Sequence, residues 1–241
     1  MIELKKVTKT YRNGIRALDG ISLFIAKGEM VYLTGKSGSG KSTLLKMLYK
    51  EESANNGLVR VNNRNISQLN QKDTYKLRRE IGVVFQDFKL LPTLTVYENI
   101  AYVLEALEIP TDEIEERVVD VLQTVGLIHK RWDYPPDCSG GEQQRVAIAR
   151  AICNNPKILI ADAPTGNLNP EYAEEIMRLF YRINKKGTTI IIATHNMGLI
   201  EKFPNRVLEM SKGVLLSDRS KNHISILLSE DFNDRLGEMI I

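Results

Sequence analysis

Residues 35–42, GKSGSGKS, follow the apolar run MVYLT and precede TLLKMLYK, whose apolar residues have helical spacing. The four residues Gly35, Gly40, Lys41 and Ser42 fit the pattern of a phosphate-binding loop, which requires a strand before it and a helix after it. Glycines let backbone N–H groups curl around phosphate oxygens, and the following helix directs its positive end at the same anion. The stretch therefore favours a phosphate site over an ordinary glycine-rich turn.

The residue types of this loop indicate a nucleotide and a divalent cation. A lysine at this position bridges the β- and γ-phosphates, and a hydroxyl at the next position can ligate Mg²⁺. We expect Lys41 to hold phosphate and Ser42 to hold the metal. The predicted cradle consists of Gly35, Lys36, Ser37, Gly38, Ser39, Gly40, Lys41, Ser42 and Thr43.

Strand-like and helix-like stretches alternate along much of the chain. Runs such as KILIAD and TTIIIATH, separated by amphipathic helices, predict an α/β protein with a parallel sheet covered on both faces. The first 60 residues are richer in strand, including the single strand-like stretch ISLFIAKGEMVYLTG, and predict an antiparallel layer. A helical subdomain is predicted at about residues 90–150, with Thr111 capping one helix. No repeat or long linker divides the chain, so residues 1–241 are predicted to form one domain.

Composition and charge argue against a nucleic-acid-binding protein and against a chain that spans a membrane itself. The net charge of +3 arises from 33 basic and 30 acidic residues and is too small to indicate nucleic acid. No apolar run approaches the roughly 18 residues that can span a bilayer, and MIELKKVTKTY lacks the apolar core of a signal peptide. The two cysteines, Cys138 and Cys153, lack metal-ligand spacing and are expected to be free thiols in a reducing cytosol.

A second possible anion site lies at CSGGEQQR, residues 138–145. Its Ser-Gly-Gly turn opens a helix, and a helix N-terminus attracts negative charge. The chain thus carries two possible phosphate cradles but one phosphate-loop lysine. A two-fold dimer would satisfy both, with each nucleotide held between the phosphate loop of one chain and the Ser-Gly-Gly turn of the other. A simple capped helix is the alternative.

The phosphate loop, Gln86, SGGE, Asp162 and His195, in this order, resemble the ATP-binding subunits of the ATP-binding-cassette (ABC) family over at least residues 1–215. The resemblance implies a RecA-like parallel-sheet core, an antiparallel β layer and an inserted helical subdomain. It also implies ATP and Mg²⁺ as cofactors. By this resemblance Tyr11 stacks on adenine, His195 contacts the γ-phosphate, and the metal is held by Ser42, Gln86 and Asp162. The ATP of the other monomer is contacted by Ser139, Gly140, Gly141 and Glu142.

Each of these residues also has a structural interpretation. Tyr11 could be a half-buried strand aromatic, Gln86 a polar strand end and His195 a buried histidine with satisfied hydrogen bonds. Their shared position after apolar stretches, and their order, favour the functional roles.

Three stretches of the sequence resemble the cell-division branch of the family: GVVFQDFKLLP, TVYENIAYVLE and PTGNL. That resemblance implies a transmembrane partner of the FtsX type, activation of peptidoglycan hydrolases, and a peripheral location at the cytoplasmic face of the membrane. Gln86 would sense this partner. The ATPase of another exporter or importer is the alternative, whereas a chromosome-maintenance or translation factor would usually carry a long coiled coil or two cassettes.

Three positions depart from the family pattern. Cys138 replaces a leucine, and a cysteine is a small hydrophobe with little expected effect. Asn169 replaces an aspartate in the loop that crosses the dimer. Ala163 replaces the glutamate that follows Asp162 and acts on the attacking water.

Alanine cannot accept a proton, and a general base typically contributes about 10² to 10⁴ in rate. ATP binding is expected to survive and even to tighten, because a carboxylate about 5 Å from the γ-phosphate would repel it by roughly 3 kcal/mol at an effective dielectric of 20. We therefore expect a chain that binds Mg-ATP, dimerises and turns over slowly. Ala163 is either an engineered trap, which the otherwise complete site favours, or the mark of a lineage that uses ATP as a clamp or scaffold.

Overall fold

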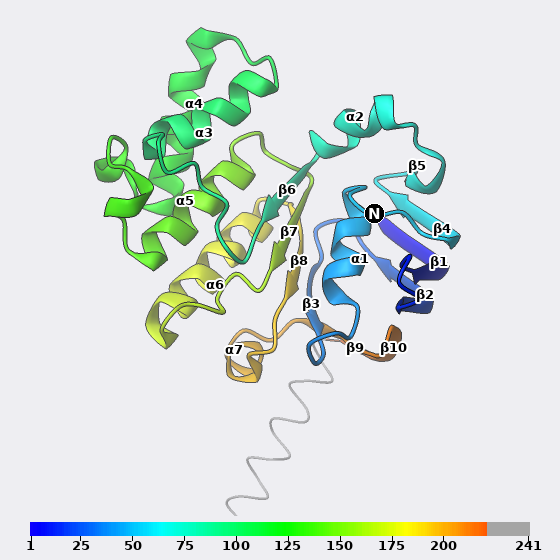
Figure 1. Ribbon diagram of the computed structural model, residues 1–241. Helices are drawn as coiled ribbons and strands as arrows, with labels where there is room; N and C mark the ends of the chain where they lie inside the picture. The colour runs from blue at the N-terminus through cyan, green and yellow to red at the C-terminus, as the bar shows by residue number, and fades with distance from the viewer. Residues whose placement is uncertain (221–241) are drawn as a thin grey trace, which may run out of the picture.

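The computed structural model describes residues 1–220 (Figure 1). The weakly patterned tail that begins at Asp218 lies outside these residues, apart from its first three positions. Asp218 and Arg219 belong to the last strand of the described chain. Within residues 1–220, no helix combines the length and the apolar character needed to cross a membrane.

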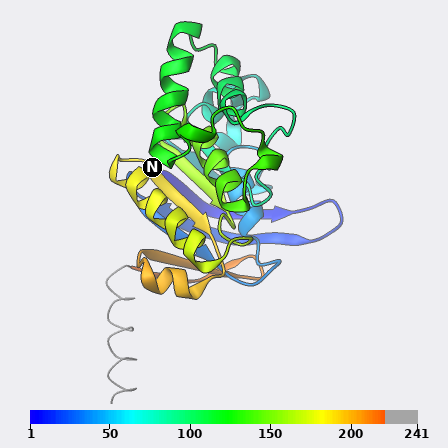
Figure 2. The ribbon, with the colours of Figure 1, turned by 90° about the vertical axis from the view of Figure 1, so that its left-hand side faces the viewer.

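The N-terminal residues form an antiparallel sheet, as predicted. Its order is β2-β1-β4-β5, and the long β1–β2 hairpin projects from the body of the molecule (Figure 2). Its strands are β1 (Ile2–Thr10), β2 (Arg16–Ile25), β4 (Asn56–Val61) and β5 (Arg64–Asn65).

A second sheet of six strands has the order β10-β9-β3-β8-β7-β6. All of its neighbouring strands are parallel except β10, which is antiparallel to β9. The strands are β3 (Met30–Thr34), β6 (Ile81–Val84), β7 (Ile158–Asp162), β8 (Thr189–Ala193), β9 (Arg206–Ser211) and β10 (Val214–Arg219). The predicted fold class is therefore confirmed.

Seven α-helices in residues 1–220 cover these sheets. Helix α1 lies between the two sheets, while α3, α4 and α5 gather at the opposite side of the molecule and α6 lies along the six-stranded sheet (Figures 1 and 2). The helices are α1 (Lys41–Leu48), α2 (Thr74–Arg78), α3 (Val96–Ala106), α4 (Thr111–Val125), α5 (Gly140–Ile152), α6 (Pro170–Lys185) and α7 (Met197–Lys202). Short 3₁₀ turns occur at Ile66–Gln68, Gln71–Asp73, Ile128–Lys130 and Pro135–Asp137.

Alternating side chains of the parallel strands contribute to two separate cores. On β8, Ile190 and Ile192 pack with the helices α3 to α7, whereas Ile191 packs with α1 and the antiparallel sheet. Such two-sided burial explains why the strand reads TIIIA with no polar face. The parallel sheet is thus fixed from both sides, and its loops are held on a rigid support.

Two local expectations need correction. The stretch ISLFIAKGEMVYLTG is two strands in different sheets, because Gly28 adopts φ 75° and the Glu29 carboxylate accepts a hydrogen bond from the Ala26 N–H. Thr111 is the first residue of α4 rather than its cap, since Pro110 occupies the capping position. Proline fixes φ near the helical value and so begins the helix without a side-chain hydrogen bond.

Close packing of β6 against α5 gives a test of the fold. A Cβ added at Gly82 would lie 2.1 Å from the Ala151 carbonyl oxygen, so Gly82→Ala must push strand and helix apart. We expect a loss of about 1–3 kcal/mol in the free energy of unfolding, measured by chemical denaturation. Gly198→Ala is the matched control, because its added Cβ meets only Asn196 Oδ1 at 3.5 Å in helix α7. Equal stability of the two variants would contradict this packing.

Candidate nucleotide-binding site

The predicted site residues follow the carboxyl ends of adjacent parallel strands. The phosphate loop follows β3, Gln86 follows β6, Asp162 ends β7 and His195 follows β8. Ligands bind at this edge in open α/β sheets, because the strand ends and their loops converge there. Two hydrogen bonds extend the ladder beyond the strands, from the Ala163 N–H to the Ala193 carbonyl at 2.9 Å and from the Thr194 N–H to the Leu33 carbonyl at 3.1 Å.

One open cavity of about 980 Å³ brings these residues together. Its walls include the whole stretch from Gly35 to Thr43 together with Tyr11, Gln86, Asp162, Ala163 and His195. Residues separated by up to 184 positions in sequence, from Tyr11 to His195, thus face one space. The cavity has the size of a ligand site, and charged and polar side chains are among the residues that line it.

Glycines shape the phosphate loop in two ways. Gly35, Gly38 and Gly40 adopt φ values of 137°, 76° and 101°, which side chains rarely tolerate. At Gly35 and Gly40 an added Cβ would also lie within 2.1 Å of the Met210 carbonyl oxygen and 2.4 Å of the Ala17 carbonyl oxygen. Two of the glycines are therefore needed for packing as well as for the curl of the loop.

Helix α1 begins at this loop without a side-chain cap. Its capping residue is Gly40, which has no side chain to accept a hydrogen bond. The first backbone N–H groups of a helix have no partner within the helix, and they carry its positive end. In contrast to α3 and α5, which carry capping boxes, α1 therefore presents these groups to an anion.

The Lys41 ammonium group folds back over the loop. It donates to the Gly35 carbonyl at 2.7 Å, the Lys36 carbonyl at 3.0 Å and the Ser39 hydroxyl at 3.3 Å. Burial lowers the pKa of Lys41, and attraction to Asp162 opposes this change. The cation thus stands inside the cradle with neutral partners, and a phosphate there would add the negative charge that stabilises its charged form.

The donor set fits a magnesium ion as well. Asp162 and Gln86 line the same cavity as the Ser42 hydroxyl, and all three offer oxygen atoms. Mg²⁺ prefers oxygen ligands and usually combines one or two carboxylates with phosphate and water. These residues therefore remain the predicted metal site.

Tyr11 lines the same cavity beside the phosphate loop. Its hydroxyl lies 3.1 Å from the Thr43 Oγ1, and the Lys9 ammonium lies 5.1 Å from the centre of its ring. The cavity is also lined by four neighbouring residues that were not predicted from the sequence: Asn13, Ile15, Arg16 and Ala17. Their place next to Tyr11 in the β1–β2 hairpin is the signal that could have found them.

The Ser139 turn is not part of this cavity. Ser139 caps α5 in a capping box, where its hydroxyl accepts from the Glu142 N–H at 3.3 Å and the Glu142 carboxylate accepts from the Ser139 N–H at 2.8 Å. The hydrogen bond from the Ser139 backbone, followed by other contacts, lowers the pKa of Glu142. Gly140 and Gly141 lie beside the start of α6, since added Cβ atoms would approach Leu168 and Tyr172. The Ser139 turn therefore caps helix α5 and does not line the nucleotide cavity of its own chain.

The three departures have clear local structures. Cys138 is buried among apolar residues, as expected for a small hydrophobe. Asn169 caps α6 and accepts a hydrogen bond from the Tyr172 N–H at 2.9 Å, a role that asparagine and aspartate fill equally well. Ala163 has φ 47°, a left-handed conformation, directly beside Asp162. Strained residues of this kind gather at functional sites.

Comparison with known proteins agrees with this geometry. The family profile for ABC transporters matches residues 18–166. The chain is 48% identical over 221 residues to the cell division ATP-binding protein FtsE of Bacillus subtilis, covering 92% of this chain and 97% of that protein. It is 50% identical to FtsE of Streptococcus pneumoniae, with 92% and 96% covered.

Solved structures show the same architecture. A dimeric ATP-binding cassette in a post-hydrolysis state with ADP and Pi is 36% identical and has a TM-score of 0.83, with 92% of this chain and 99% of that chain covered. The structure of cbiO1 from Clostridium perfringens, part of the ABC transporter complex cbiONQ, is 31% identical with a TM-score of 0.88, covering 100% and 95% of the two chains.

The left-handed backbone of Ala163 gives a stability test that does not depend on catalysis. Replacing Ala163 by glycine removes about 1–2 kcal/mol of steric cost, against about 0.4–1 kcal/mol of added unfolded-state entropy. We expect Ala163→Gly to raise the free energy of unfolding by about 0.5–1 kcal/mol. Ala161→Gly, in the buried strand β7, is the control and should lower it. Chemical denaturation measures both, and equal losses would show that the backbone at 163 is unstrained.

Proposed function

Because the chain belongs to the ABC transporter family of ATP-binding subunits, which are ATPases, and resembles its cell-division members, we propose that it dimerises around Mg-ATP and drives a transmembrane partner of the FtsX type. In this role it would act at the cytoplasmic face of the membrane and help to activate peptidoglycan hydrolases. One observation carries the proposal: the cavity of about 980 Å³ gathers the phosphate loop with Tyr11, Gln86, Asp162 and His195 at one sheet edge.

The Ser139 turn supports dimerisation around the nucleotide. It stands outside the chain's own cavity, and its helix α5 presents an N-terminal positive end. A second copy related by two-fold symmetry would supply a phosphate to this turn and receive one in return. The dimeric cassette among the similar solved structures supports the same arrangement.

In the proposed mechanism, binding and hydrolysis depend on different residues. The Lys41 ammonium and the α1 N-terminus hold the phosphates, Tyr11 holds the base, and His195 contacts the γ-phosphate. Mg²⁺ would be held by Ser42, Gln86 and Asp162, and when bound it offsets charge on the phosphates. The groups proposed for binding are thus all present, whereas the methyl group of Ala163 cannot take a proton from water. Slow turnover and a long-lived ATP state follow.

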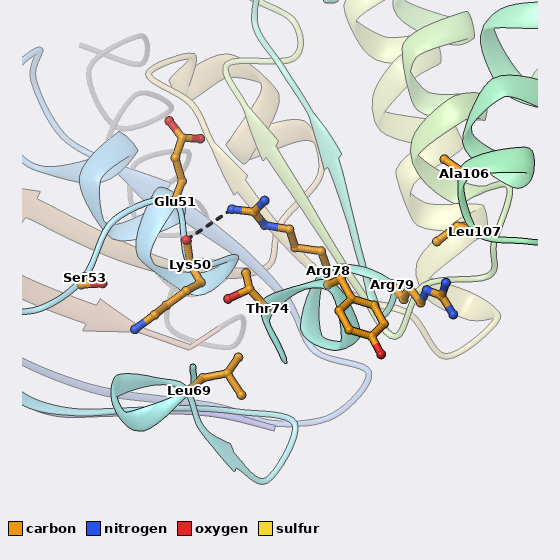
Figure 3. A pocket seen from close by; sticks show the side chains of 10 residues that line it. Lys50, Glu51, Ser53, Leu69, Thr74, Arg78, Arg79, Ala106 and Leu107 are labelled. Atoms are coloured by element: carbon orange, nitrogen blue, oxygen red, sulfur yellow. Dashed lines mark hydrogen bonds between the residues drawn. The ribbon is translucent and has the colours of Figure 1, made fainter. Parts of the chain in front are cut away.

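A groove beside the site is the proposed surface for the membrane partner. Two cavities of about 780 and 660 Å³ share the residues Glu51, Arg78, Arg79 and Leu107, so they form one groove between α1, α2 and α3. Figure 3 shows one end, where Arg78 donates to the Lys50 carbonyl at 3.3 Å and caps the end of α1. Three cations, Lys50, Arg78 and Arg79, line this end against one carboxylate.

The other end of the groove is mainly apolar. Tyr102, which is 56% exposed, and Leu91 line it, and Lys89 links it to the loop after Gln86. Large exposed aromatic side chains are typical anchors of protein interfaces. The groove therefore suits a cytoplasmic segment of the partner that carries both apolar and acidic side chains.

A non-hydrolysing ATP clamp is the second candidate function. It is favoured by the loss of two carboxylates from one loop, at Ala163 and Asn169, while the groups that would bind ATP are retained. In this case ATP would hold the dimer as a scaffold, and Ala163 would be native. The subunit of another ABC exporter or importer stays a further alternative, which the identity of the copurifying membrane protein decides.

Restoring the carboxylate distinguishes a disabled ATPase from a clamp. We expect Ala163→Glu to raise phosphate release by about 10² to 10⁴, because a general base contributes that much in rate. Size in solution, measured with and without Mg-ATP, should show a lasting dimer for the parent chain and a transient one for Ala163→Glu. Ala163→Gln, which has similar size but no basic carboxylate, is the control.

An unchanged rate in Ala163→Glu would exclude the disabled ATPase and leave the clamp. If neither chain binds ATP, the assignment of the phosphate loop is wrong. If both bind ATP and stay monomeric in solution, dimerisation requires the membrane partner.

The groove is tested by separating partner binding from nucleotide binding. Lys50→Glu and Tyr102→Ala should each weaken capture of the membrane partner by about tenfold or more, as expected where a few interface residues supply most of the binding energy. Neither should change ATP affinity, because neither residue lines the nucleotide cavity. Trp132→Ala is the matched control, since Trp132 is 58% exposed but lies outside the groove. Equal losses in all three variants would contradict this docking surface.

A further inference from the structure

Helix α5 reaches the loop that follows Gln86 through one side chain. The Arg150 guanidinium donates to the Lys89 carbonyl at 2.5 Å and to the Phe88 carbonyl at 2.7 Å. Two bonds from one planar guanidinium fix orientation as well as distance. Burial lowers the pKa of Arg150, and the guanidinium remains charged because an arginine side chain does not lose its proton in proteins.

The backbone that Arg150 holds is strained. Phe88 and Lys89 have φ values of 58° and 52°, two consecutive left-handed residues that are not glycine. The Lys89 N–H also donates to the Asp87 carbonyl at 2.6 Å, which closes a tight three-residue turn around Phe88. Turns of this hand are rare because the Cβ atom crowds the carbonyl oxygen. Such a turn persists only where surrounding groups enforce it.

The remainder of the loop has a different anchor. The Asn99 side chain, on α3, accepts from the Leu91 N–H at 2.8 Å and donates to the carbonyls of Leu91, Leu94 and Thr95. Asn99 therefore fixes residues 91–95 but makes no hydrogen bond to the strained turn at 87–89. Only Arg150 among the side chains of residues 1–220 donates to the carbonyls of Phe88 and Lys89.

Arg150 also connects two functional positions. It lies on the same helix that Ser139 caps, eleven residues further on, and so about 16 Å along a rigid α-helix. The turn it holds begins directly after Gln86, which lines the nucleotide cavity. A movement of α5 can therefore reach Gln86 through the guanidinium and the turn at 87–89.

We propose that Arg150 is a positioning residue, which holds the strained turn at 87–89 so that Gln86 faces the metal, and thereby couples the Ser139 helix to the chain's own ATP site. The inference rests on the proposed function, since it takes Gln86 as a residue that serves Mg²⁺. Without the guanidinium, the turn relaxes to ordinary backbone angles and Gln86 leaves the metal.

The test compares ATP affinity in the presence of Mg²⁺ and in the presence of EDTA, by titration of the full chain. We expect Arg150→Ala to weaken Mg-ATP binding on the order of tenfold, as for the loss of a charge-assisted hydrogen bond. Its affinity for metal-free ATP should stay unchanged. Gln86→Ala should show the same pattern, and Arg150→Lys, which keeps the charge but loses the fork, should lie between.

A second change tests the strain itself. Adding Lys89→Gly to Arg150→Ala should recover part of the Mg-ATP affinity, because glycine adopts φ 52° without steric cost. Lys89 is exposed, and its ion pair with Asp87 is between two side chains that are each 62% exposed, so its removal costs little. Arg145→Ala is the control on the same helix, since Arg145 bonds to Glu175 on α6 at 3.0 Å instead.

The possible outcomes distinguish a failure of the Arg150 role from a failure of the proposed metal role of Gln86. Equal loss of affinity with and without Mg²⁺ in Arg150→Ala, or no rescue by Lys89→Gly, would overturn the positioning role and leave Arg150 as a packing residue. If Gln86→Ala itself leaves the Mg²⁺ dependence unchanged, the metal role of Gln86 in the proposed function fails, and the role of Arg150 fails with it. Thermal unfolding of each variant confirms that the chains compared are folded.

Discussion

The hydrogen-bonded ladder of parallel strands at the centre of the six-stranded sheet is the constraint on which the rest depends. Beyond the strand ends, the Ala163 N–H bonds to the Ala193 carbonyl and the Thr194 N–H bonds to the Leu33 carbonyl. These bonds hold the start of the loop after β7 against β8 and the start of the loop after β8 against β3, which leads into the phosphate loop. Because both faces of the sheet are buried, the loops cannot shift independently of the cores that hold them.

The cavity combines the groups proposed to bind ATP with a methyl group at the position proposed for the general base. Lys41 stands inside its cradle among neutral oxygens, and α1 begins without a side-chain cap, so both are suited to an anion. Ala163 keeps the left-handed backbone at the end of β7 but has no group to accept a proton. Asn169 preserves the helix cap while removing a charge. In the proposed mechanism these two positions keep their local structure, while the change at Ala163 removes a group that hydrolysis would need.

Local sequence was sufficient to predict the phosphate loop, the two kinds of sheet and most elements, because glycine spacing and hydrophobic periodicity act over short distances. It was not sufficient for the split of ISLFIAKGEMVYLTG into β2 and β3, since a turn at Gly28 sends two similar apolar runs into different sheets. The contact from Arg150 to Phe88 and Lys89 could not be predicted from local sequence either, because it joins residues that are 62 and 61 positions apart.

The sequence by itself determined which groups the protein can offer: a glycine cradle with its lysine, a capped Ser-Gly-Gly turn, and a methyl group in place of a carboxylate. Tertiary structure alone decided which of these groups share a cavity, and it placed the Ser139 turn outside the chain's own site. It also decided that the turn after Gln86 is strained and held from α5. The reason is that residue chemistry is local, whereas distances between strand ends, helix termini and loops are set by how the two buried cores pack.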